Sequence, residues 1–363
     1  MGPKFLSLLI LLTALPLAGV ATPAVAGQVA PADTTAPALA ILPFADNANR
    51  SDADSLLTTT LHRLLTDNGL AYVPARDLRP LLRHHRVRSR GWISRRGMKL
   101  VASETGARHL LLGSWDVFRD AGNIEFGVSL RVLDVETEAL VAAISVGGTG
   151  EDTVSWLDLG RIESMEVLVE TILRRALEEL LPIPESPEIP PSWRGCNHLA
   201  VIPFDNFSET VNAGGIVTNV VLSRLLAEGY FVVEPGFVRE LGLARETVVI
   251  GGVDRASARA IRDSLGACRI VTGAVETFEP ARGEPSASVP RVALGVRVTY
   301  VESGLLYSMH ELEGAGDDSQ SVFQQGRIHG LIPLVSGLLQ ELARELSQEN
   351  RKDIIHGPRR SIH

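Results

Sequence analysis

Residues 39–44 read Leu-Ala-Ile-Leu-Pro-Phe, and residues 199–204 read Leu-Ala-Val-Ile-Pro-Phe. Each copy is a short apolar run that proline ends, which is typical of a buried parallel strand that stops at a turn. A long stretch of similar pattern follows each copy. The hexapeptide therefore predicts the first core strand of each of two repeated units.

The two units can be paired residue by residue. At an offset of 160, Gly106 meets Gly266. The second unit then has a longer hairpin loop, after which the offset becomes 166 and Arg131 meets Arg297. Two constant offsets joined by one insertion predict a tandem duplication of a whole domain, because the period far exceeds the roughly 20–50 residues of solenoid repeats.

Apolar periodicity predicts the elements within a unit. In the first unit the predicted strands are 39–42, 71–73, 109–117, 126–132 and 140–146, and the predicted helices are 56–65, 95–105 and 154–180. The last two strands alternate apolar and polar residues, as an antiparallel hairpin does. The predicted fold class is α/β, with two tandem β-α-β-α-β-β-β-α domains, each a mixed sheet with an antiparallel hairpin and packed helices.

Composition shifts divide the chain further. A proline-rich stretch separates the two units and predicts a stiff, extended linker. The predicted segments are a signal peptide at 1–26, a flexible leader at 27–37, a first domain at 38–181, the linker at 182–197, a second domain at 198–347 and a mobile tail at 348–363.

The N-terminus has the pattern of an export signal. Lys4 precedes an apolar run over residues 5–20, and residues 24–26 read Ala-Val-Ala, which matches a cleavage site. The run is short and interrupted by Pro16, which favours cleavage over a permanent membrane anchor. No cysteine follows it, so lipidation is not expected. We predict a periplasmic protein without a transmembrane span after cleavage.

Composition and motifs exclude several classes of function. The chain is 45% hydrophobic and 21% charged, which is globular, and its net charge of −8 gives no reason to expect nucleic-acid binding. The glycine-rich residues 212–215 lack the spacing of a nucleotide-binding loop. Neither a nucleophile elbow nor a pattern of metal ligands occurs. We therefore predict a protein that is not an enzyme and binds neither a cofactor nor a metal.

One basic stretch interrupts this acidic chain. Residues 79–99 hold no acidic residue, whereas the paired residues 239–259 mix both charges. Its cations are Arg79, Arg83, Arg86, Arg88, Arg90, Arg95, Arg96 and Lys99. This basic patch is a candidate site for an acidic partner or an anionic envelope component. The alternative is a solvated surface whose charges balance nearby acids.

The two cysteines, Cys196 and Cys268, lie just before the first and third strands of the second unit. If those strands are parallel neighbours, their starts lie about 5 Å apart, which a disulfide tolerates. Export makes the bond chemically reasonable. We predict a Cys196–Cys268 disulfide, and the alternative is two buried free thiols.

Three motifs resemble a group of bacterial envelope domains. Residues 39–44 are similar to its opening strand, residues 106–113 (Gly-Ala-Arg-His-Leu-Leu-Leu-Gly) to its next buried strand, and residues 130–137 (Leu-Arg-Val-Leu-Asp-Val-Glu-Thr) to its strand and turn. The group includes the amino-terminal domain of TolB, the periplasmic domain of the curli-secretion channel, and lipoprotein activators of penicillin-binding proteins. Glu138 stands where the turn glycine is usual, whereas the second unit keeps Gly304.

The resemblance implies docking modules of envelope assemblies. The leading hypothesis is thus a non-enzymatic periplasmic interaction or scaffold protein that docks to an envelope complex or an anionic envelope component. Its exposed candidates are the basic patch and the loops after Phe44 and Phe204. The alternative is a module that binds a small ligand or glycan at the loops where the strands end.

Overall fold

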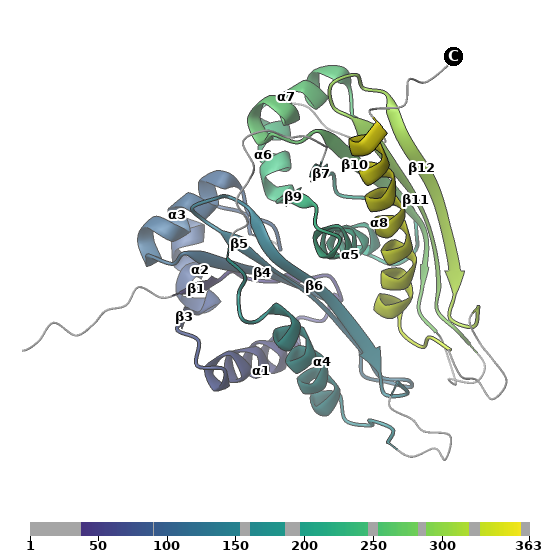
Figure 1. Ribbon diagram of the computed structural model, residues 1–363. Coiled ribbons are helices and arrows are strands. Elements are labelled where there is room, and N and C mark those ends of the chain that lie inside the picture. The colour runs from purple at the N-terminus through teal and green to yellow at the C-terminus, as the bar shows by residue number, and fades with distance from the viewer. Residues whose placement is uncertain are drawn as a thin grey trace, which may run out of the picture. The chain divides into compact units, whose positions relative to one another are not determined.

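A computed structural model describes residues 38–89, 91–152, 160–185, 197–245, 253–281, 288–318 and 327–356. The residues from Ala36 onward form one compact unit. Two sheets with their helices make up this unit (Figure 1). We call the elements from β1 to α4 the first half and those from β7 to α8 the second half.

The two halves share one order of elements. The first half contains β1 (Leu39–Ile41), β2 (Ala45–Asp46), α1 (Asp54–Asp67), β3 (Tyr72–Val73), α2 (Ala75–His84), α3 (Arg95–Thr105), β4 (His109–Arg119), β5 (Glu125–Asp134), β6 (Leu140–Thr149) and α4 (Met165–Leu180). The second contains β7 (His198–Val201), β8 (Asp205–Asn206), α5 (Ala213–Ala227), β9 (Phe231–Val233), α6 (Pro235–Ala244), α7 (Arg255–Leu265), β10 (Arg269–Glu279), β11 (Arg291–Tyr300), β12 (Leu306–Ala315) and α8 (Leu331–His356).

Each half builds one mixed sheet. The strand orders are β3-β1-β4-β5-β6 and β12-β11-β10-β7-β9, with β2 and β8 paired to β4 and β10. β1 runs parallel to β3 and β4, whereas β4, β5 and β6 are antiparallel. The second sheet repeats this pattern. The predicted fold class is therefore confirmed, and each hexapeptide supplies the central parallel strand of its sheet.

Several predicted boundaries hold at the residue level. α3 and α7 end at Gly106 and Gly266, whose φ angles of 70° and 69° are the left-handed conformation that glycine adopts freely. Their first turns are capped by the side chains of Ser94 and Asp254. The predicted helix 95–105 is thus confirmed at both ends.

Other boundaries differ from the prediction. Each half contains a further helix, α2 or α6, that the predicted order lacks. α2 escaped notice because Pro80 interrupts a sequence with only a few buried apolar residues. The predicted closing helix, 154–180, corresponds to α4, which begins at Met165 because Ser164 caps it by accepting a hydrogen bond from the Val167 amide. Residues 160–164 before it are not helical, and residues 153–159 lie outside the described residues.

The first sheet is buried on both faces. All ten residues of β5 are buried, including Ser129 and Arg131 on the face that does not meet α1 and α4. That face is covered by α5 and α8, and Ile332 of α8 packs directly on Gly127 and Gly147. A single hydrophobic cluster accordingly joins residues of both halves. The sequence predicted a separate core within each domain. The structure also contains a core that the two halves share.

Buried polar groups cross this shared core. Arg131 of β5 donates to Asn219 Oδ1 of α5 at 2.7 Å, and its Nε lies 3.5 Å from Glu234 Oε2. Asn219 also donates to Ser114, which in turn donates to the fully buried Asp116 at 2.6 Å. The hydrogen bonds fix how α5 lies against the first sheet, since buried polar groups are costly without partners.

Candidate functional site

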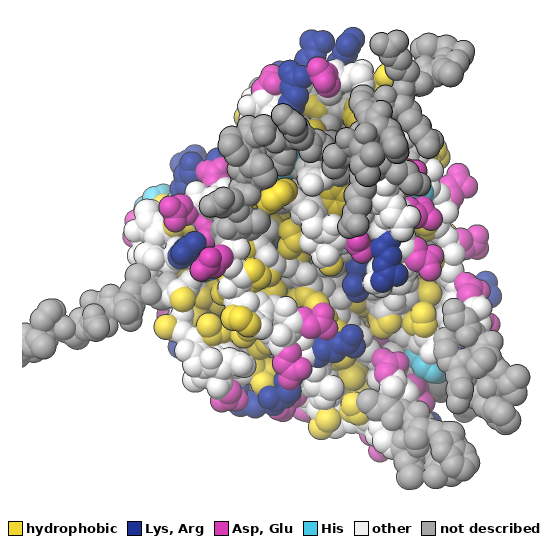
Figure 2. All heavy atoms as spheres, viewed as in Figure 1, with side chains coloured by type: hydrophobic (Ala, Val, Ile, Leu, Met, Phe, Trp, Pro, Cys, Tyr) yellow, Lys and Arg dark blue, Asp and Glu magenta, His cyan; other side chains and the backbone are white. Residues whose placement is uncertain are grey.

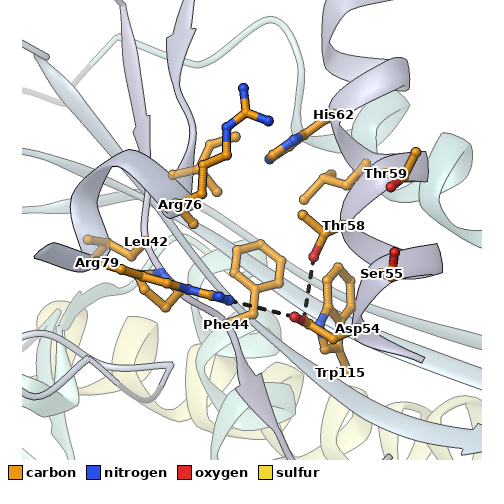
Figure 3. A pocket seen from close by; sticks show the side chains of 14 residues that line it. Leu42, Phe44, Asp54, Ser55, Thr58, Thr59, His62, Arg76, Arg79 and Trp115 are labelled. Atoms are coloured by element: carbon orange, nitrogen blue, oxygen red, sulfur yellow. Dashed lines mark hydrogen bonds and ion pairs between the residues drawn. The ribbon is translucent and has the colours of Figure 1, made fainter. Parts of the chain in front are cut away.

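A cavity of about 220 Å³ opens at the carboxyl end of β1, between α1 and α2 (Figure 3). We call it the strand-end pocket. β1 stops at Pro43, and Phe44 then turns its ring toward the sheet, where the absence of a side chain at Gly113 leaves room for it. In open α/β sheets this edge is where ligands commonly bind.

Two aromatic rings form the apolar part of the lining. Phe44 and Trp115 pack with centroids 4.7 Å apart and planes tilted by 48°. Trp115 is only 3% exposed, and its Nε1 has no hydrogen-bond partner among the described residues. A buried indole N–H without a partner is costly, so this donor is a feature that a bound acceptor would satisfy.

Charged and hydroxyl side chains line the rest. Asp54 of α1 accepts a hydrogen bond from Thr58 at 3.4 Å and lies 3.6 Å from Arg79 Nη2. Figure 3 draws both contacts as dashed lines. Arg76 of α2 lies 3.5 Å from its neighbour Asp77 and is 78% exposed. Both ion pairs are long and solvated, so neither guanidinium is held strongly.

His62 of α1 reaches the pocket beside Arg76 (Figure 3). Burial lowers the pKa of His62, and the positive charge of Arg76 lowers it further, while Asp77 acts in the opposite direction. The imidazole Nε2 has no hydrogen-bond partner within the described part of the chain. His62 is therefore neutral near pH 7, and an anion placed beside it would raise its pKa.

The lining is thus rich in donors and poor in arranged catalytic groups. Arg76, Arg79 and Trp115 offer N–H groups, and Asp54 is the one carboxylate among the residues that line the pocket. In the described ranges, no three His, Cys, Asp or Glu side chains are grouped to hold a metal ion. The pocket is equipped to recognise hydrogen-bond acceptors, above all anionic ones.

The structure divides the predicted basic patch. Arg79 lines the strand-end pocket, whereas Arg83, Arg86 and Arg88 are exposed away from its lining. Arg90 lies outside the described residues. On the face drawn in Figure 2, Lys and Arg side chains lie among Asp and Glu side chains.

The α3 end of the patch has acidic partners. Arg95 and Lys99 pair with Glu138 at 2.6 and 3.0 Å, and Arg96 is exposed. Arg95 and Glu138 also line a second cavity of about 170 Å³, with Phe237 of the second half. Two of the three cations at this end therefore share one carboxylate that is distant in sequence.

The predicted disulfide remains a prediction. β7 and β10 are parallel neighbours, with Leu199 paired to Arg269, as the geometric argument required. Cys268 immediately precedes β10, and its amide donates to His198 O at 2.9 Å. Cys196 lies outside the described residues.

Sequence patterns alone pointed to the loop after Phe44 and to Arg79 of the basic patch, but missed the other helix residues that line the pocket. A signal was present at the 160 offset. Asp54, Ser55 and His62 are paired with Gly214, Gly215 and Leu222, and Arg76 with Gly236. Where one copy has polar residues and the other has apolar residues or glycine, the pattern indicates a polar site that only the first copy contains.

No family model and no curated protein matches this chain. Among solved structures, it is similar to the PelC dodecamer from Paraburkholderia phytofirmans, with 19% identity and a TM-score of 0.30 over 42% of this chain and 89% of that chain. Lipoprotein GNA1162 from Neisseria meningitidis is 17% identical, with a TM-score of 0.28 over 43% of this chain and 98% of that chain. The LpoB C-terminal domain from Escherichia coli is 16% identical, with a TM-score of 0.24 over 36% of this chain and 87% of that chain.

LpoB represents one group of the sequence resemblance, the lipoprotein activators of penicillin-binding proteins. The TolB part of that resemblance stays a prediction. At these TM-scores the likeness carries no argument about function. Within the residues that the structure describes, no helix is both long and apolar enough to cross a membrane.

Proposed function

We propose that this protein is a non-enzymatic interaction protein of the bacterial cell envelope, exported to the periplasm, that docks to an envelope protein. The observation that supports docking is the strand-end pocket. It holds four groups with N–H donors, from Arg76, Arg79, His62 and Trp115, of which the His62 and Trp115 nitrogens have no partner among the described residues. The apolar run and cleavage pattern of residues 1–26 support export.

The size of the pocket favours a docked protein over an enclosed small ligand. Sites that bury small molecules usually measure about 300–1,000 Å³. The strand-end pocket is smaller, at about 220 Å³, and its arginines are largely exposed. It fits one protruding group of a larger partner. The aromatic pair and hydroxyl groups keep a small ligand or glycan as the second candidate.

Crosslinking in envelope fractions tests the proposal. A tagged full-length chain is expressed in its native host, treated with a membrane-permeable amine crosslinker, and purified under denaturing conditions. We expect one envelope protein to be enriched, and the same chain expressed without residues 1–26 to capture none of it. Recovery of the exported chain without any crosslinked envelope protein would contradict the proposal.

A further inference from the structure

In the second half, the crevice between α5 and α6 is already occupied by a segment of the first half. Residues 92–95, which we call the inserted segment, run from the first half across α5 and α6. Trp92 Nε1 donates to Asn219 Oδ1 at 3.3 Å, and the Ile93 amide donates to Glu234 Oε1 at 3.3 Å. The Arg95 amide donates to Glu240 Oε2 at 2.8 Å. The crevice thus holds the non-helical residues 92–94 and the first residue of α3 through two backbone amides and one buried side chain, Ile93.

The strand-end pocket is the counterpart of this crevice in the first half. At the 160 offset, Asn219 pairs with Thr59, and Gly236 pairs with Arg76. Both Thr59 and Arg76 line the pocket. A Cβ built on Gly236 would overlap the carbonyl oxygen of Ile93, so glycine is what lets the inserted segment approach. The same crevice is therefore filled by peptide in one half and lined by a cation in the other.

The chemistry of the two crevices is reversed. In the second half, Asn219, Glu234 and Glu240 supply acceptors to N–H groups of the inserted segment. In the first half, Arg76, Arg79 and the Trp115 indole supply donors. A donor-rich crevice requires an occupant that brings acceptors, and guanidinium groups favour a carboxylate.

We propose that the strand-end pocket binds an extended segment of a partner protein that presents an Asp or Glu side chain to Arg76 and Arg79. This inference rests on the proposed docking function and names its chemistry. The carboxylate lies between the two guanidinium groups and beside His62, and an apolar neighbour in the segment packs on Phe44 and Trp115. The inserted segment supplies the precedent for a peptide backbone bound at this place.

Peptide binding tests the inference on the intact chain without residues 1–26. Each probe is a fluorescein-labelled, amidated pentapeptide made by inserting one residue into the tetrapeptide Gly-Trp-Ile-Ser. The inserted residue is Asp, Asn or Arg, and it is placed at each position in turn. We expect Asp members to bind and their Asn and Arg twins to bind at least about tenfold more weakly, which is roughly 1.4 kcal/mol. Equal binding of Asp and Asn twins at every position would overturn the inference.

Two charge reversals locate the site. Arg76→Glu and Arg79→Glu should each weaken binding of the Asp peptides at least about tenfold. Arg239→Glu is the matched control, because Arg239 is exposed and occupies the position paired with Arg79. Arg83→Glu controls for the general charge of α2. Loss of binding in the controls, or none in Arg76→Glu and Arg79→Glu, would show that the pocket is not the site.

Protonation of His62 gives an independent readout. Because a bound carboxylate raises the pKa of His62, affinity for the Asp peptides should increase as the pH falls from 8 to 5.5, and His62→Gln should remove this dependence. Sedimentation of the unliganded chain tests whether a second copy of the chain occupies the pocket. If the wild type self-associates and Arg76→Glu does not, the occupant is a second copy and not a segment of a partner protein. Envelope crosslinking that persists in Arg76→Glu would refute this inference and leave the proposed function standing.

Discussion

Arg131 and Arg297 occupy paired positions in opposite environments. Arg131 is 1% exposed and lies between Asn219 and Glu234, whereas Arg297 is exposed on the second sheet. Glu234 is fully buried, which raises its pKa, while Arg131 pulls that pKa down. We predict that Arg131→Leu lowers the free energy of unfolding by about 3–5 kcal/mol, because Glu234 is left buried without a cation.

Urea denaturation measures this difference. Arg297→Leu is the matched control and should change the free energy of unfolding by less than about 0.5 kcal/mol. Adding Glu234→Gln to Arg131→Leu should recover part of the loss, since it removes the stranded charge. An equal loss in the two single variants would contradict the assignment of Arg131 to a buried ion pair.

Asp116 makes the stability of this region depend on pH. Burial raises its pKa to about 6, despite hydrogen bonds from Ser114, Ser129 and Asn47. The folded state therefore keeps the proton up to about pH 6, whereas an unfolded Asp releases it near pH 4. Its contribution to stability is present below pH 4 and falls by roughly 3 kcal/mol as the pH rises to 6.

Replacing Asp116 isolates that contribution. Between pH 4 and pH 7, the wild type should lose roughly 3 kcal/mol of unfolding free energy relative to Asp116→Asn. Denaturation curves at several pH values give this difference directly. A difference that does not change with pH would mean that Asp116 is ionised throughout.

At the scale of elements, α8 lies on the first sheet through glycines. A Cβ added to Gly147 of β6 would lie 2.7 Å from Ile332 Cβ, whereas one added to Gly295 of β11 would have no neighbour within 4 Å. Gly147→Ala should cost about 1–3 kcal/mol by pushing α8 from the sheet, and Gly295→Ala should cost nothing measurable. Thermal unfolding of both variants distinguishes a close helix contact from a loose one.

How far the sequence predicts these elements depends on where their neighbours come from. The hexapeptide strands and the end of α3 before Gly106 are set by local pattern, and they were predicted correctly. Alternation in β5 correctly predicted a hairpin strand, but it did not reveal that the polar face of β5 is buried beneath α5, whose residues lie far along the chain. The pocket combines β1, α1 and α2, so no single stretch of sequence could reveal it.

The two halves form one compact unit because helices of the second half pack on the sheet of the first half. α5 is apolar around nearly its whole circumference, with one side on its own sheet and another on the first sheet. Glu125 of β5 accepts a hydrogen bond at 2.7 Å from the Leu331 amide at the start of α8. Separating the halves would expose apolar helix surface to water, which is unfavourable in proportion to its area.

We therefore predict one cooperative unfolding transition, not one for each half. Calorimetry of the intact chain should give a calorimetric enthalpy close to the van 't Hoff enthalpy, as a two-state transition does. Leu173→Ala, which removes a side chain from the core cluster made of first-half residues alone, should move the entire transition to lower temperature, whereas Arg297→Leu should leave it in place. If the chain instead melts in two steps and Leu173→Ala moves only one of them, the shared core does not couple the halves, and the two-domain organisation expected from the sequence describes the energetics as well.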